Sequence, residues 1–471
     1  MKKLYKVLVS TVFIITFGFA TVTVDGYALL ENQTDHSGIT ITFVRTAPTS
    51  LTETATTDAN GAFTTELELG VYNITYSKDG YFNEWLNDQG LYSNTTLDSD
   101  TLLTYTSLIN VPTLFSTIQS AVDHAFEGDT VLIQEGEYFE NISIGKSNII
   151  ISSNFIISSD YSDVEGTIIN GNDNGTGISI FNSASSINII GLTIQNCNSS
   201  GINYSWSSNN KIDYCIIKDN SDDRGGGAYL HFSSVDITNT VLENNSAGCG
   251  WTGCGGGAVA LWASSASFTN CVIDSNTGKG GAIYRFYSGG ISVKNCVVSN
   301  NINSDNAVNY AITGVTPTIL YSNFFNNELP DENYYGVNVT TNANGDSCDL
   351  YYNIQEDPLF VDATNDNYNL QQGSPCVDAG DPTSPYDPDG SIADMGALPS
   401  TYGTPIENIV ISSDTLLVVE DSSAAVDFQE NDLVLNVTAL VLSILDSSSH
   451  GAVAVAGDTM LAYTPVADFF G

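Results

Sequence analysis

The chain has 471 residues, with 54 acidic and only 12 basic side chains, and its formal net charge at pH 7 is −42. A surface of this sign repels nucleic acid and anionic lipid, so we expect neither as a partner. The length leaves room for about two to four domains.

Residues 1–20 have the pattern of an export signal. Three lysines among the first six residues precede a short apolar run, and Gly18 and Ala20 provide small residues for cleavage after Ala20. The run is shorter than the roughly 20 residues of a spanning helix. We therefore expect a secreted or cell-surface protein whose mature chain does not insert into a membrane.

Residues 22–109 alternate apolar and polar side chains in short segments that are separated by turn signals such as Asp58-Ala-Asn-Gly61. This period of two buries one face of each strand and predicts a small β-sandwich. The stretch TTDANGAFTTELELGVYNITYSKDGYF resembles the carboxypeptidase regulatory-like domains, which are transthyretin-like sandwiches. The resemblance implies a spacer or binding module and carries no catalytic residue.

A short amphipathic helix is predicted from Thr117 to Phe126, with Ser116 as its N-cap. The run FSTIQSAVDHAFEGDTVLIQEGEYFENISI resembles the entry of pectin-lyase-like β-helices, in which such a helix covers the first coil. A solenoid needs this cap because its end exposes apolar side chains and unpaired backbone groups.

Internal repeats follow. Five segments align without gaps, namely KIDYCIIKDN, DITNTVLENN, SFTNCVIDSN, SVKNCVVSNN and TILYSNFFNN. Their equivalent positions are Cys215, Thr240, Cys271, Cys296 and Ser322. A coil of roughly 20–30 residues is typical of a β-solenoid.

In such a solenoid, like residues of successive coils lie about 4.8 Å apart. Apolar columns are predicted at Ile212, Ile237, Phe268, Val293 and Ile319, and at Ile217, Leu242, Ile273, Val298 and Phe324. A polar column is predicted at Asn220, Asn245, Asn276, Asn301 and Asn327, whose stacked amides would satisfy the turn backbone. These columns predict an all-β protein with a right-handed parallel β-helix over residues 110–402.

Gly-Gly-Ala recurs three times and ends at Ala228, Ala258 and Ala282. With VLENN and VIDSN, this motif resembles the repeats of polymorphic outer-membrane proteins and adhesin-type β-helices, which implies a bacterial source. Residues 357–400 resemble the tail that closes exported β-helix proteins. Residues 403–471 resemble a cadherin-like or Ig-like module without its last strands, so we expect the chain to be a fragment of a longer protein.

Eight cysteines allow several arrangements. Cys215, Cys271 and Cys296 share one inward column, where parallel side chains favour stacked thiols over a disulfide. A disulfide between Cys249 and Cys254 in the inserted loop AGCGWTGC, and another between Cys348 and Cys376, are open alternatives to free thiols.

Two binding sites are predicted. Asp387, Asp389 and Asp394 in DPDGSIAD offer oxygen ligands to calcium, and the alternative is a solvated turn. After Gly-Gly-Ala, one register exposes Phe232, Trp262, Tyr284 and Phe286 as an aromatic ladder on which sugars can stack. The opposite register buries these rings and exposes His231 and Arg285.

Catalysis of the pectate-lyase type requires a basic residue that takes a proton beside a carboxylate. Arg224, Lys279 and Arg285, near Asp222 and Asp223, are the candidates, and solvated turn charges are the alternative. The Asn-Thr-Asp and Gly-His-Gly motifs of polygalacturonase-like hydrolases do not occur in the sequence. We therefore expect a noncatalytic module that binds polysaccharide or another extracellular surface. A polysaccharide lyase or hydrolase and a structural stalk or adhesin are the alternatives.

Overall fold

The computed structural model describes residues 20–248, 255–303, 312–313, 317–327, 339–403, 408–410, 416–418, 422–427, 433–435, 450–455 and 460–467. The chain forms two compact units, divided between Ser107 and Leu108. The expected export signal before Ala20 and the inserted loop with Cys249 and Cys254 lie outside the described residues.

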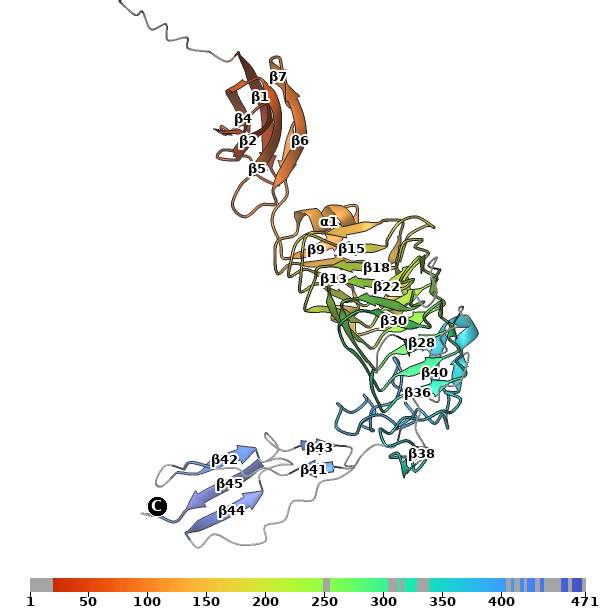
Figure 1. Cartoon of the computed structure of the whole chain (residues 1–471). Coiled ribbons are helices and arrows are strands. Elements are labelled where there is room, and N and C mark those ends of the chain that lie inside the picture. Colours follow the sequence, from red (N-terminus) through yellow and green to blue (C-terminus); the bar gives the residue numbers. More distant parts are fainter. Residues whose placement is uncertain are drawn as a thin grey trace, which may run out of the picture. The chain divides into compact units, whose positions relative to one another are not determined.

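The first unit consists of two β-sheets that share one hydrophobic core (Figure 1). One sheet contains β1 (Thr21–Leu30), β4 (Ala62–Glu68), β7 (Thr95–Thr96) and β8 (Asp100–Leu102). The other is antiparallel and contains β2 (Thr40–Ala47), β3 (Leu51–Thr56), β5 (Gly70–Ser77) and β6 (Glu84–Leu91). Buried residues alternate with partly or fully exposed ones along β1, and with partly exposed ones along β5, as a period of two requires.

The second unit contains a parallel β-helix, which confirms the predicted fold class (Figure 1). Its coils contribute one strand each to three parallel sheets. The first sheet contains β9 (Leu108–Val111), β10 (Thr130–Ile133), β13 (Ile150–Ser153), β16 (Asn188–Ile190), β19 (Asn210–Asp213), β23 (Ser234–Thr238), β27 (Ser265–Thr269), β31 (Ile291–Lys294) and β35 (Thr318–Leu320). The second contains β11 (Gly136–Tyr138), β14 (Thr167–Asn170), β17 (Thr193–Gln195), β20 (Ile216–Lys218), β24 (Val241–Glu243), β28 (Val272–Asp274), β32 (Val297–Ser299) and β36 (Asn323–Phe325).

The third sheet contains β12 (Ile142–Ile144), β15 (Ile178–Ile180), β18 (Ile202–Ser205), β22 (Ala228–His231), β26 (Val259–Trp262), β30 (Ile283–Phe286) and β34 (Ile312–Thr313). A narrow fourth ladder joins β21 (Ser221–Asp222), β25 (Ser246–Ala247), β29 (Thr277–Gly278) and β33 (Ile302–Asn303).

The predicted apolar columns are confirmed residue by residue. In the first sheet, Ile237 pairs with Ile212 on one side and with Phe268 on the other. In the second sheet, Leu242 lies between Ile217 and Ile273 in the same way. All of these side chains are fully buried, so the core of the β-helix is a stack of like residues.

The Asn column lies at the turn after the second sheet and is buried. The Asn220 amide donates to Asn245 Oδ1 at 3.1 Å, and the Asn301 amide donates to Asn327 Oδ1 at 2.9 Å. Each amide also donates to a strand carbonyl, such as Ile194 O for Asn220 at 3.0 Å. The column therefore satisfies turn backbone groups that water cannot reach.

Helix α1 (Ile118–His124) lies at the β9 end of the stack and contacts β9, β10 and β12 (Figure 1). Its N-cap is Thr117, which accepts a bond from Ser120 N at 3.1 Å, so the prediction of Ser116 is wrong by one residue. Both carboxylate oxygens of Glu140 accept from the first turn, from Ile118 N and Gln119 N at 3.0 Å each. These bonds satisfy backbone N–H groups of the first turn, which have no carbonyl partner within the helix.

The segment after the last coils packs on the second sheet instead of only closing the end of the stack. It contains β37 (Thr340–Thr341), β38 (Ser347–Cys348), β39 (Phe360–Asp362), the 3-10 turn Ala363–Asn365 and β40 (Asn367–Leu370). Tyr368, Leu370 and Met395 share a buried cluster with Val241 and Val272 of the second sheet. The segment therefore covers apolar side chains that a bare β-helix would expose.

A polar cluster, in which Glu243, Asp274 and Tyr368 are buried and Asp366 is exposed, joins this segment to the second sheet. Lys218 Nζ lies 2.5 Å from Asp366 Oδ2 and 3.9 Å from Glu243 Oε1. Tyr368 OH donates to Asp274 Oδ2 at 3.2 Å. Burial is the main cause that raises the pKa of Glu243 to about 7.

The remaining short elements are α2 (Phe155–Ser158), α3 (Ser162–Gly166), β41 (Asn408–Val410), β42 (Ala424–Asp427), β43 (Leu433–Leu435), β44 (Gly451–Val455) and β45 (Met460–Pro465). β42, β45 and β44 form an antiparallel sheet, and β41 pairs with β43. Within the described ranges, no helix combines the length and the apolar character needed to span a bilayer.

Candidate functional site

The third sheet carries the aromatic side chains that the sequence singled out. Its register places Ala228 beside Val259, whereas the alignment on Gly-Gly-Ala placed it beside Ala258. That alignment is wrong by one residue for this coil. The observed register stacks Leu230 on Tyr204, and both are fully buried. This register is favoured because it buries Leu230, while the rings of its neighbours Tyr229 and His231 face outward.

The outward positions hold a connected group of rings, namely Tyr229, His231, Trp262, Tyr284 and Phe286. Trp262 pairs with Phe286 in the ladder, and their ring centroids are 5.3 Å apart. Tyr284 contacts Phe286 edge to face at 4.4 Å. Trp262, Tyr284 and Phe286 are partly exposed. In the coils of β26 and β30, the observed register is therefore the one that exposes the rings.

Arg224 lies over this ring group. Its guanidinium carbon is 5.3 Å from the centroid of Tyr229 and 5.6 Å from that of Trp262, and its Nη1 donates to Tyr229 OH at 2.8 Å. Burial, and next the charge of Arg224, lower the pKa of His231. The arginine thus serves as a cation–π partner that holds the rings in place.

A second aromatic column lies at the corner between the third and the first sheets. Trp206, Phe232, Ala263 and Tyr287 each follow a strand of the third sheet, and backbone bonds such as Phe232 N to Trp262 O at 2.9 Å keep them in register. The prediction placed Phe232 in one row with Trp262, but it lies one residue further on, in this corner column. The Trp206 and Phe232 rings are stacked, with centroids 4.2 Å apart and an interplanar angle of 12°.

The corner column is exposed and its backbone is unusual. Trp206 is 57% exposed, Phe232 40% and Tyr287 69%. All three have positive φ, between 49° and 64°, a conformation that bulky side chains rarely adopt. At the corner after the second sheet, the same conformation is taken by small polar residues, namely Asn196, Asp219, Asn244, Ser275, Asn300 and Asn326. Aromatic residues are therefore present at this corner against the backbone preference.

A polar groove of about 370 Å³ runs beside the corner column, on the outer side of the first sheet. Its lining begins two or three residues after each corner residue, at Asn209, Ser234, Ser265 and Gly290. The groove continues over Asp236, Ser267, Ser292 and Thr318, which lie in one row of the ladder. Its wall thus offers hydroxyl and amide groups on every coil.

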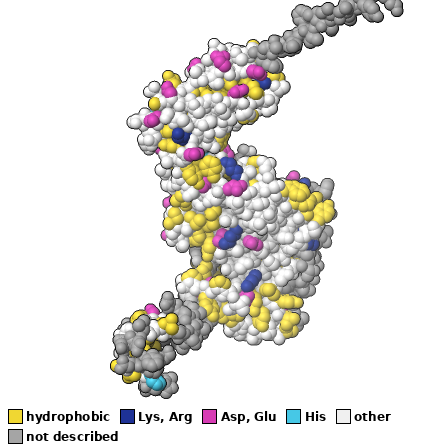
Figure 2. All heavy atoms as spheres, turned by 90° about the vertical axis from the view of Figure 1, so that its left-hand side faces the viewer, with side chains coloured by type: hydrophobic (Ala, Val, Ile, Leu, Met, Phe, Trp, Pro, Cys, Tyr) yellow, Lys and Arg dark blue, Asp and Glu magenta, His cyan; other side chains and the backbone are white. Residues whose placement is uncertain are grey.

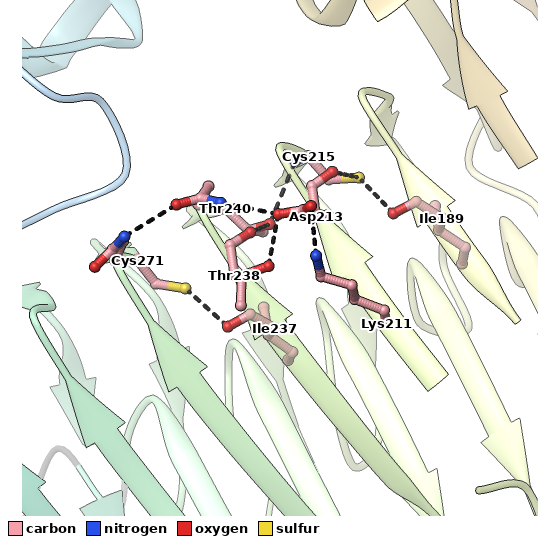
Figure 3. Close-up of polar contacts among 10 residues, drawn as sticks. Ile189, Lys211, Asp213, Cys215, Ile237, Thr238, Thr240 and Cys271 are labelled. Atoms are coloured by element: carbon pink, nitrogen blue, oxygen red, sulfur yellow. Dashed lines mark hydrogen bonds and ion pairs between the residues drawn. The ribbon is translucent and has the colours of Figure 1, made fainter. Parts of the chain in front are cut away.

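Polar contacts hold the strands of this wall together. Asp213 accepts from Lys211 Nζ at 2.7 Å and from Thr238 Oγ1 at 2.5 Å, as Figure 3 shows. On the inner side of the same strands, Cys215 Sγ and Cys271 Sγ are directed at carbonyls of the preceding coils (Figure 3). On the face drawn in Figure 2, basic and acidic side chains lie next to each other in a few places, among uncharged ones.

The three candidate catalytic residues lie at different positions in the coils, Arg224 and Lys279 in turns before strands of the third sheet and Arg285 within that sheet. Arg224 is exposed at a turn and bound to Tyr229, as described above. Arg285 pairs with the buried Leu261 but is itself partly exposed, and its guanidinium donates to Gly289 O. Lys279 lies two coils from Arg224, since Gly225 pairs with Gly256 and Gly280 N donates to Gly255 O.

The candidate calcium ligands bind backbone amides. Asp387 Oδ2 accepts from Asp394 N at 2.8 Å, and the two oxygens of Asp394 accept from Asp378 N and Ser400 N. Asp389 Oδ1 accepts from Ser391 N at 3.0 Å. No group of three or more acidic, His or Cys side chains in the described part of the chain is arranged to hold a metal ion. These bonds show the carboxylates as caps of the turn, and the calcium site stays a prediction.

The cysteines of the described residues are all free and buried, including the column of Cys215, Cys271 and Cys296. Cys271 N donates to Cys296 Sγ at 3.4 Å, which places the two residues on neighbouring coils, as predicted. The open alternative of a Cys348–Cys376 disulfide is not realised.

Sequence reasoning missed Trp206 and Tyr287. A signal for both was present, since the corner reads Trp206-Ser-Ser, Phe232-Ser-Ser, Ala263-Ser-Ser and Tyr287-Ser-Gly in successive coils. The buried Ser207, Ser233 and Ser264 form a hydrogen-bonded ladder in which Ser207 N donates to Ser233 Oγ at 3.0 Å. This ladder explains why a serine follows Trp206, Phe232 and Ala263.

Comparison with known proteins gives no family assignment, since no family model and no curated protein matches the chain. Among solved structures, the pectate lyase Pel9A is 12% identical, covers 60% of this chain and 90% of its own, and has a TM-score of 0.36. The rice weevil pectin methyl esterase is 14% identical, covers 52% and 87%, and has a TM-score of 0.29. A type II cohesin–X-dockerin complex from Acetivibrio cellulolyticus is 20% identical, covers 19% and 67%, and has a TM-score of 0.16. The description of the fold therefore depends on the strand registers given above.

Proposed function

We propose that the chain is an extracellular polysaccharide-binding protein whose binding surface is the corner column together with the adjacent groove. The observation that carries this proposal is the positive φ of the exposed rings of Trp206, Phe232 and Tyr287. A strained, exposed aromatic residue has no role in burying the core, and such strain gathers at ligand sites.

The chemistry of the surface matches a glycan. Pyranose rings present C–H groups that pack on aromatic rings, and their hydroxyl groups need hydrogen-bond partners close by. The serine and asparagine side chains of the groove, such as Ser234 and Asn209, supply those partners within a few residues of the rings.

Binding without catalysis is the form that we propose. Proton abstraction needs a base positioned at the substrate. Arg285 is partly exposed, but its guanidinium is bound to Gly289 O, and Arg224 is bound to Tyr229 and lies over two rings. No observation favours an elimination reaction at the corner column.

The test is affinity electrophoresis of the full chain through gels that contain soluble polysaccharides, with a glycan array to choose the polysaccharide. We expect the wild-type protein to be retarded and the variants Trp206→Ala and Phe232→Ala to migrate freely. Phe139→Ala is the matched control, since Phe139 is 62% exposed but belongs to another part of the β-helix. Equal retardation of all four proteins, or none on any polysaccharide, would contradict the proposal.

A further inference from the structure

The corner column has one member that is not aromatic. Ala263 lies in register between Phe232 and Tyr287, because Phe232 N donates to Trp262 O and Ala263 N donates to Phe286 O. Trp206 and Phe232 are stacked face to face, but at Ala263 the stack of rings is interrupted. Tyr287 instead contacts Trp262, at 4.8 Å and 66°.

At Ala263 the column carries a methyl group where the neighbouring coils carry a ring. Coils are spaced by about 4.8 Å, so the backbones that carry Phe232 and Tyr287 are about 10 Å apart. A ring between two others needs about 3.5 to 4 Å of contact distance on each side. Ala263 is itself partly exposed, and Phe232 keeps one face that Trp206 does not cover.

The charge of the surroundings restricts what can enter. Among the residues that line the groove, Asp236 is the single ionisable one, and the others are neutral. Nearby, Lys211 is paired with Asp213 at 2.7 Å. A polyuronate would bring one carboxylate per sugar toward Asp236 without a cation of the lining to receive it, and this is unfavourable.

We propose that one neutral pyranose ring of the bound glycan occupies the space over Ala263, between Phe232 and Tyr287, with its hydroxyl groups directed at the groove. This inference rests on the proposed function and deepens it, because it names both the substrate class and the position of one sugar ring. The bound ring completes the stack that the sequence interrupts at Ala263.

The experiment places a larger side chain at position 263. Ala263→Phe introduces a ring at a backbone position whose φ is +49°, the value that Phe232 already has one coil away. Ala263→Gly leaves the space open and is the matched control. Binding of the full chain to cellohexaose, mannohexaose and a galacturonate hexamer is measured by calorimetry, with thermal unfolding as a check on folding.

We expect a neutral hexamer to bind the wild type and Ala263→Gly alike, and Ala263→Phe about tenfold more weakly, as for the loss of one ring contact. Tyr287→Ala removes the ring on one side of Ala263 and should weaken binding as well. It provides an independent measurement if Ala263→Phe fails to fold. Unchanged affinity of the Ala263→Phe and Tyr287→Ala variants overturns the inference but not the proposed function. Equal or tighter binding of the galacturonate hexamer overturns the neutral substrate class. Absence of binding to every glycan overturns both.

Discussion

Asn245 donates both its backbone N–H and its side-chain amide to a single atom, Oδ1 of Asn276, at 3.0 Å each. The Asn276 amide in turn donates to Leu242 O at 2.9 Å and to Asn301 Oδ1 at 3.1 Å. Each asparagine of the column therefore connects the turn of its own coil to both neighbouring coils, and the column works as a continuous polar spine inside the fold.

Replacement of Asn276 by alanine should strongly destabilise the folded protein. The substitution removes the acceptor of two Asn245 donors and the donor to Leu242 O, all of them buried. We expect a loss of about 3 kcal/mol or more in the free energy of unfolding, because each unsatisfied buried group costs about 1–3 kcal/mol. Urea unfolding followed by circular dichroism measures the change. Asn369→Ala, at an exposed position, is the control and should be nearly neutral.

Replacement of Phe232 by asparagine should separate binding from stability. Asparagine adopts positive φ more readily than phenylalanine, and this gain offsets the loss of the contact between Phe232, which is 40% exposed, and Trp206. We expect the melting temperature to stay equal or to rise, while retardation in polysaccharide gels is lost. A clear drop in melting temperature would mean that the Trp206–Phe232 stack is needed for folding rather than for a ligand.

The Glu243 carboxyl should make stability depend on pH. Its pKa in the folded protein is raised from 4.5 to about 7, first by burial. A raised carboxyl pKa means that the fold holds the proton more tightly than the unfolded chain does. This contribution is complete below pH 4.5 and is lost as the pH rises toward 7.

Glu243→Gln removes this titration while it keeps the shape of the side chain. We therefore expect the difference in melting temperature, variant minus wild type, to increase between pH 4.5 and pH 8, in the direction of a more stable variant. Glu127→Gln, at an exposed position, is the matched control and should give a constant difference. A constant difference for Glu243→Gln as well would contradict the buried environment described here.

The buried thiols should be unreactive in the native protein. Burial raises the pKa of Cys215 to about 12, that of Cys376 to about 12 and that of Cys197 to about 11. The thiolate is the reactive form, so both access and ionisation are opposed. In a Cys249→Ser/Cys254→Ser variant, we expect negligible reaction with a thiol reagent at pH 8 and reaction of all six remaining thiols after denaturation. Fast labelling of the native variant, or fewer thiols after denaturation, would show that the cysteine column is open or oxidised.

The sequence by itself determined the repeat and its registers in the first and second sheets. Ile212, Ile237 and Phe268 could be aligned because each coil must place an apolar residue at the same depth of the core. The Asn column and the free thiols of Cys271 and Cys296 follow from the same rule, since stacked coils bring identical positions together.

Tertiary structure decided what the repeat does not encode. The one-residue shift of Ala228 arose because the buried neighbours of Leu230, such as Tyr204, come from other coils and favour one register. Placement of residues 360–395 on the second sheet depended on buried contacts between residues far apart in the chain, such as Tyr368 with Asp274. The corner column was identified only when Trp206, Phe232 and Tyr287 were seen at positive φ beside one groove, because backbone conformation and exposure arise from the stacking of whole coils and not from local pattern.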